Sequence, residues 1–261
     1  MSASGLSSSR CFGRRSAAEP VRRPLLLAAL AALAATAVAP AAAAQRRAAP
    51  APAAPARADW VATAVRTAEG GVRIGNPAAR AKLIEYGSIT CPHCAAFARE
   101  ATARLYTYVR SGRVSWEYRP YMIFSTDPGI FALLGCQAPQ AFFGTVEQLY
   151  STQPSWKLLA MNYLEGNEAR FERMGVNARA AALVRASRVD RLFAAHGMSQ
   201  ARIDACLASP ANLTRIADIA RRANRTYDVS GTPTFILNGR VADAGTWTQL
   251  EPLLRAAIGA R

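Results

Sequence analysis

Histidine is scarce in this sequence, and closely paired cysteines occur once. Among 261 residues there are two histidines and five cysteines, and the single CxxC motif is Cys91-Pro92-His93-Cys94. A structural zinc site needs about four cysteine or histidine ligands. There is no second CxxC, and the one further histidine is His196. The sequence therefore predicts no metal site.

Acidic residues are also few, with 17 Asp and Glu against 32 Lys and Arg and a net charge of +15. Such an excess can attract nucleic acid. The arginines are scattered, however, and no basic strip is interleaved with aromatic residues in the way a nucleic-acid surface requires. We expect no nucleic-acid partner and interpret the charge as a solvated basic surface. Attraction to anionic lipid headgroups is the alternative.

A long apolar run near the N-terminus extends from Leu25 to Val38. Arginines precede it, and Pro40 and the small residues Ala41 to Ala44 follow it. This pattern is typical of a secretory signal peptide, so residues 1–44 are predicted to be cleaved after Ala44. An uncleaved membrane anchor is the alternative, because the run approaches spanning length. Cleavage would leave 27 basic and 16 acidic residues, a net charge of +11, and four cysteines in an oxidising compartment.

The rest of the chain shows no internal repeat and divides by its apolar periodicity. Residues 45–58 are rich in Pro and Ala and are predicted to be a linker. Beyond it, the patterns predict an α/β fold with the order β, β, α, β, helical insertion, β, β, α. The expected elements are a brief strand within 70–77, strand 82–87, helix 92–110, strand 114–120, helices near 128–137, 139–152, 154–164, 177–195, 199–208 and 210–226, strand 234–237, an Asn238-Gly239 turn before Val241, and helix 246–258.

The CxxC motif stands where a buried strand gives way to a helix. A thiolate attacks disulfides, and unpaired N–H groups at a helix N-terminus lower the pKa of a cysteine there. Cys91 fits that place, Pro92 suits the first helical turn, and His93 can add positive charge or a donor beside the sulfur. Cys94, one turn along, can displace a bound substrate. The motif therefore predicts an oxidising disulfide with Cys91 as nucleophile, and an inert structural disulfide is the alternative.

CPHC after the second strand, Gly231-Thr232-Pro233 before the fourth, a helical insertion between them and a signal peptide form a distinctive combination. It resembles the DsbA-type thiol oxidoreductases of bacterial periplasms over about residues 60–258. The resemblance implies a thioredoxin-like fold with an inserted α-helical domain. Residues 59–125 and 227–261 would then form the thioredoxin-like domain, and 126–226 the helical insertion.

The resemblance also assigns roles to three residues outside the motif. Pro233 would be cis and lie against the disulfide, with Thr232 presenting its backbone to an extended substrate. Glu85, six residues before Cys91, would be a buried acid that exchanges a proton with Cys94. The alternatives from the residues alone are an ordinary trans turn proline and an edge-strand glutamate that points to water.

The expected partners follow from the same resemblance. Substrates would be unfolded or extended cysteine-containing exported proteins in the periplasm, and a membrane partner linked to quinone would reoxidise the motif. No metal or organic cofactor would be needed, and we expect a monomer. A disulfide isomerase or reductase of the same fold is an alternative, because Thr232 is also common among isomerase-like members. A noncatalytic peptide-binding or chaperone module, with a merely structural CxxC, is the alternative from another class.

Two further cysteines lie on apolar helical faces of the predicted insertion. Some DsbA-like proteins carry a second, noncatalytic disulfide in this region, which implies a bond between Cys136 and Cys206. Two separate buried thiols are the alternative, since a free cysteine packs well as a small apolar side chain.

Overall fold

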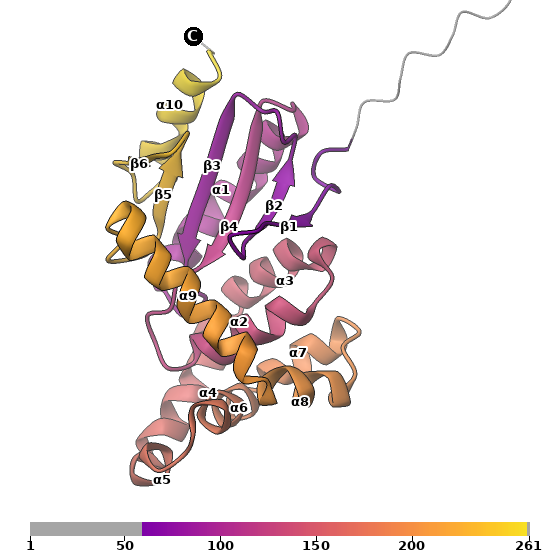
Figure 1. Ribbon diagram of the computed structural model, residues 1–261, viewed down its shortest axis with the longest axis vertical. Helices are drawn as coiled ribbons and strands as arrows, with labels where there is room; N and C mark the ends of the chain where they lie inside the picture. The colour runs from indigo at the N-terminus through magenta and orange to yellow at the C-terminus, as the bar shows by residue number, and fades with distance from the viewer. Residues whose placement is uncertain (1–58, 260–261) are drawn as a thin grey trace, which may run out of the picture. The chain divides into compact units, whose positions relative to one another are not determined.

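The computed structural model of the protein describes residues 59–259 (Figure 1). The predicted signal peptide at 1–44 and linker at 45–58 lie outside the described residues. Within the described part, no helix is long and apolar enough to cross a membrane.

A six-stranded mixed sheet has the order β1-β2-β4-β3-β5-β6. Its strands are β1 (Val65–Arg66), β2 (Val72–Gly75), β3 (Ala81–Gly87), β4 (Val114–Pro120), β5 (Thr234–Leu237) and β6 (Arg240–Ala242). The central pair β3 and β4 is parallel, and the other pairs are antiparallel. The predicted strands are confirmed, and the sequence did not predict β1, whose two residues are both exposed.

Helices cover both faces of this sheet, and the residues of β3 alternate between them. Leu83 belongs to the large core cluster that includes α1, and Glu85 contacts Trp116 on the same face. Ile84 and Tyr86 pack in a second cluster with α9. In Figure 1, α9 crosses in front of the strands and α1 lies behind them. The helices named here are α1 (Pro92–Arg110) and α9 (Pro210–Tyr227).

The region between β4 and β5 is helical, as predicted. Besides α9 it contains α2 (Asp127–Cys136), α3 (Pro139–Ser151), α4 (Gln153–Glu165), α5 (Glu168–Glu172), α6 (Val176–Ala186), α7 (Val189–Ala195) and α8 (Gln200–Ala208), and α10 (Trp247–Ala257) closes the described chain. The core cluster is continuous from the sheet into these helices. The insertion therefore shares one hydrophobic core with the sheet.

The prediction of one helix at 177–195 is wrong, because the chain breaks between α6 and α7. Arg188 has a φ of 61° there, in the left-handed region that a continuous helix excludes. A further short helix, α5, was also not predicted. The predicted N-cap Ser199 is confirmed, since its hydroxyl accepts a hydrogen bond from the Arg202 N–H at 3.3 Å.

Candidate redox site

The CxxC motif opens helix α1. Cys91 is the N-cap residue in extended conformation, and Pro92 is the first helical residue. The thiols of Cys91 and Cys94 are both free and buried. The sulfur of Cys91 therefore sits at the positive end of a 19-residue helix, where backbone N–H groups lack intrahelical acceptors.

The electrostatic environment strongly favours a Cys91 thiolate. The pKa of Cys91 is lowered to about 5, mainly because the Cys94 thiol hydrogen-bonds to its sulfur. Hydrogen bonds from the Thr232 side chain and from the backbone N–H groups of Cys94 and His93 lower this pKa further, whereas burial raises it. The imidazole of His93 is exposed, and its own tuning effect stays a prediction.

The loop before β5 closes over the same sulfur. The Thr232–Pro233 peptide bond is cis, so the alternative of a trans turn proline is wrong. The Cys91 Sγ donates a hydrogen bond to the Thr232 carbonyl at 3.3 Å. The Thr232 hydroxyl is buried and makes no hydrogen bond within residues 59–259, so its lowering of the Cys91 pKa belongs to the thiolate form of Cys91. A hydroxyl at this place is free to donate to the thiolate once it forms.

Glu85 lies on the central strand β3 and is 2% exposed. The alternative that it points to water from an edge strand is therefore wrong. Its Oε2 accepts a hydrogen bond from Trp116 Nε1 at 3.1 Å. Burial raises the pKa of Glu85 to about 8, and the Trp116 bond opposes this only in part. The carboxyl is therefore protonated at neutral pH.

Cys94 shares this buried environment. Its pKa is raised well above the ordinary value by burial, by its hydrogen bond to Cys91 and by the charge of Glu85. The two cysteines thus differ in the direction of their pKa shifts, which is the condition for one nucleophilic and one proton-bearing sulfur.

Two tyrosines that the sequence did not predict complete the site. The hydroxyls of Tyr118 and Tyr150 lie 2.8 Å apart, and Tyr150 also donates to the Ser88 carbonyl at 3.2 Å. They line a cavity of about 10 Å³ together with Glu85, close to the volume that one water molecule needs. Burial and the charges of Cys94 and Glu85 raise the pKa of both tyrosines. They come from β4 and α3, so no local sequence pattern connects them with the motif.

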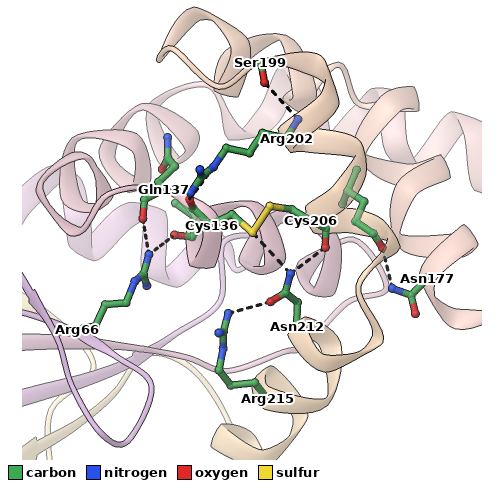
Figure 2. Close-up of a disulfide and its surroundings, with 11 residues drawn as sticks. Arg66, Cys136, Gln137, Asn177, Ser199, Arg202, Cys206, Asn212 and Arg215 are labelled. Carbon is green, nitrogen blue, oxygen red and sulfur yellow. Dashed lines mark hydrogen bonds between the residues drawn. A yellow bond between two sulfur atoms is a disulfide. The ribbon is translucent and has the colours of Figure 1, made fainter.

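Cys136 and Cys206 form a disulfide, so the alternative of two separate thiols is wrong. Their Cα atoms are 6.4 Å apart, and the bond joins the end of α2 to α8 across 70 positions (Figure 2). Asn212 donates to the Cys206 carbonyl at 3.0 Å beside it. Within the described residues, no group of three or more His, Cys, Asp and Glu side chains could hold a metal ion.

The family model described as Thioredoxin matches residues 67–256. Among solved structures, a protein-disulfide isomerase from Novosphingobium aromaticivorans is 30% identical with a TM-score of 0.67, covering 71% of this chain and 96% of that chain. The alpha-DsbA1 of Wolbachia pipientis is 17% identical with a TM-score of 0.60, covering 75% and 94%. BdbD from Bacillus subtilis is 14% identical with a TM-score of 0.52, covering 72% and 92%. No curated protein sequence matches the chain.

The family match extends over well more than half of the sequence and includes both the CxxC motif and the loop of Pro233. The solved structures cover 71% and 75% of the chain and share its fold. The chain therefore belongs to this thioredoxin family and has the fold of its DsbA-type thiol-disulfide oxidoreductases.

Proposed function

We propose that the protein is an exported thiol:disulfide oxidoreductase that donates its Cys91–Cys94 disulfide to newly translocated proteins. The observation that carries this proposal is the position of Cys91 at the N-terminus of α1, 3.3 Å from the Thr232 carbonyl, which goes with a lowered pKa of Cys91 and a raised pKa of Cys94. Because the reduced motif holds a stable Cys91 thiolate, reduction of the disulfide is favoured and the oxidised motif is an oxidant.

In the proposed reaction, a substrate thiolate attacks Sγ of Cys91 in the oxidised motif. A mixed disulfide forms, the bond between the two motif sulfurs breaks, and Cys94 leaves with the electron pair. Glu85, protonated at neutral pH, gives its proton to the Cys94 sulfur. A second substrate thiolate then attacks the substrate sulfur and expels the Cys91 thiolate. The substrate loses two electrons and the motif gains them.

Thr232 and Pro233 would hold the substrate during this exchange. Both are half-buried and border the Cys91 sulfur through the Thr232 carbonyl. An extended substrate segment laid along this loop would bring its cysteine to Cys91 by backbone hydrogen bonding, which is tolerant of sequence. Such tolerance suits a protein that acts on many unfolded chains.

The direct test mixes the oxidised protein with a reduced, unfolded protein that contains two cysteines. The expected result is formation of the substrate disulfide with one equivalent of dithiol appearing in the motif. The Cys91→Ser variant should lose this activity entirely. If that variant still protects the unfolded substrate and wild type forms no disulfide, the noncatalytic chaperone alternative is correct.

A disulfide isomerase is the second candidate, because the 30% identical relative carries that name and Thr232 also suits isomerase-like members. An isomerase works from the reduced motif. Two rates would distinguish the candidates. One is the recovery of substrate activity when reduced protein is incubated with a substrate containing scrambled disulfides in a buffered thiol pool, and the other is the oxidation of reduced substrate by oxidised protein. For an isomerase, the first rate should be the faster one.

Export and reoxidation complete the proposal. The N-terminal pattern of the sequence supports secretion into the periplasm, where a membrane partner linked to quinone would regenerate the disulfide. Cells that lack quinone should accumulate this protein in its reduced form, as measured by thiol trapping of Cys91 and Cys94. Full oxidation under those conditions would refute a quinone-linked partner.

A further inference from the structure

The segment Ser88–Cys91 joins strand β3 to helix α1 and carries the reactive sulfur at its end. All four residues are buried, and the segment has no helix or strand of its own. The Cys91 N–H donates to the Ser88 carbonyl and the Ala95 N–H to the Cys91 carbonyl, both at 3.2 Å, whereas the buried Ile89 and Thr90 carbonyls need donors from elsewhere in the fold. Where these donors come from decides what holds Cys91 in place.

Side chains of the helical insertion supply a donor to each carbonyl of this segment. The bonds are Tyr150 Oη to Ser88 O at 3.2 Å, Gln153 Nε2 to Ile89 O at 2.7 Å and to Cys91 O at 3.0 Å, and Lys157 Nζ to Thr90 O at 3.0 Å. Tyr150 lies in the last turn of α3, and the other two donors lie one turn apart on α4. The insertion thus forms hydrogen bonds with the backbone next to the nucleophile.

Asp127, the first residue of α2, accepts hydrogen bonds from the donor groups of the same segment. Its carboxylate accepts the Thr90 N–H at 3.1 Å and the hydroxyls of Ser88 and Thr90 at 2.8 Å each. It also accepts the N–H groups of Ile123 and Phe124. Asp127 is fully buried, so the Thr90 N–H and the two hydroxyls of the segment are held by the insertion as well.

We infer that Gln153 and Lys157 are positioning residues of the redox reaction, which hold the carbonyls of Ile89 and Thr90 away from the Cys91 sulfur. This inference rests on the proposed function, because it concerns the stability of the thiolate that makes the motif an oxidant. Carbonyl oxygens are the negative ends of peptide dipoles, and one turned toward the sulfur would oppose its charge. With the carbonyls bound by the insertion, the sulfur faces the N–H groups that begin α1.

Gln153 is suited to this role by its burial. It is 5% exposed, and its one amide nitrogen serves the carbonyls on both sides of Thr90. A side chain fixed in this way cannot turn to water, so the Ile89 carbonyl keeps one direction. Loss of the amide would leave the buried Ile89 carbonyl without a donor and the Cys91 carbonyl with its Ala95 bond alone, so the backbone before the nucleophile could turn.

Lys157 adds a positive charge beside the same backbone segment. Its ammonium group lies 4.6 Å from the centre of the Phe124 ring, and the bond to Thr90 O places it one residue from Cys91. The aromatic ring and the carbonyl together restrict a side chain that is otherwise flexible. A fixed cation beside the N-cap favours a thiolate over a thiol.

The test compares Gln153→Leu and Lys157→Met with wild type in two measurements, the pKa of Cys91 and the equilibrium of the motif with glutathione. We expect each variant to lower the ionisation constant of the Cys91 thiol about tenfold, which means that the pKa of Cys91 rises. At neutral pH this shifts the glutathione equilibrium about tenfold toward the disulfide form, equal to about 30 mV in the reducing direction. Lys157→Arg, which keeps charge and donor, should stay near wild type.

Asn177→Leu is the matched control, because Asn177 donates to the Leu207 carbonyl at 2.7 Å elsewhere in the insertion. It removes a hydrogen bond of the same kind and should lower stability without moving the Cys91 pKa. If Gln153→Leu and Lys157→Met lower stability and leave the pKa and the glutathione equilibrium unchanged, the inference is overturned and these contacts serve folding alone. Should Gln153→Leu fail to fold, the comparison of Lys157→Met with Lys157→Arg at this half-buried position tests the inference by the same two measurements.

The outcomes separate this inference from the proposed function. The pKa of Cys91 can be titrated whether or not the protein oxidises any substrate. A raised pKa in both variants together with a wild type that forms no substrate disulfides would support positioning and refute the proposed activity. An unchanged pKa in variants of an active oxidant would do the reverse.

Discussion

Replacing Glu85 by Gln should make the protein more stable at neutral pH, although it removes a group proposed to act in the reaction. The folded carboxyl has a pKa of about 8 against an ordinary 4.5, so folding at pH 7 must bind a proton that the unfolded chain lacks. The cost grows by about 1.4 kcal/mol for each pH unit above the unfolded pKa, so it reaches about 3 kcal/mol at pH 7. Glutamine avoids the cost and keeps an oxygen for the Trp116 N–H.

The sign of the pH dependence is fixed by the raised pKa. The cost is absent below pH 4.5, where both states are protonated, and grows as the pH rises toward 8. The variant should therefore exceed wild type by roughly 2 to 3 kcal/mol at pH 7, allowing for one additional amide N–H, and should equal wild type or fall up to about 1 kcal/mol below it near pH 4.

Urea unfolding of the reduced proteins between pH 4 and pH 8 measures this difference, because the titration of Cys91 is common to both and cancels. Glu251→Gln makes the same carboxyl-to-amide change at a half-buried position and serves as the control. A Glu85→Gln variant less stable than wild type at pH 7, or a difference that does not change with pH, would show that Glu85 is not held as a buried acid.

Three other results are expected. Thr232→Val should raise the pKa of Cys91, measured by thiolate absorbance, because it removes a hydroxyl that stabilises the thiolate; an unchanged pKa would remove that role. Cys94→Ser should leave Cys91 able to attack and unable to release, so that mixed disulfides with exported proteins accumulate on nonreducing gels, and their absence in cells that express the variant well would count against substrate exchange. Replacing Cys136 and Cys206 by Ala should lower the melting temperature, with a loss of roughly 4 kcal/mol for a 70-position loop, and leave the Cys91 pKa nearly unchanged. A large shift of that pKa would mean that the second bridge reaches the site.

The parts of the site that the sequence could predict depend on local patterns. A proline that cannot donate directly follows Cys91, and this fixed the start of α1. Glu85 interrupts an apolar strand, and the structure places that strand at the centre of the sheet. The expected fold and the two pairs of cysteines depended in addition on the resemblance, since spacing alone left the second bridge open.

The parts that could not be predicted depend on contacts between distant segments. Gln153 lies 62 positions from Cys91, and glutamine in an amphipathic helix looks like any solvent-facing residue until the fold buries it. The pair of Tyr118 and Tyr150 forms only when the insertion closes on the sheet. Arg188 adopts a backbone conformation that its residue type disfavours, so the break between α6 and α7 carried no local signal.

The reduction potential of the Cys91–Cys94 pair distinguishes a donor of disulfides from a reductant. A thiolate with a pKa of about 5 is almost fully ionised at pH 7, whereas the corresponding thiolate of thioredoxin, with a pKa of about 7, is half ionised. This difference alone stabilises the reduced motif about fiftyfold and moves the potential by about 50 mV from the −270 mV of thioredoxin. Equilibration with glutathione at pH 7 should therefore give a potential of about −220 mV or more oxidising. A value at or below about −270 mV would contradict the account of this protein as a donor of disulfides.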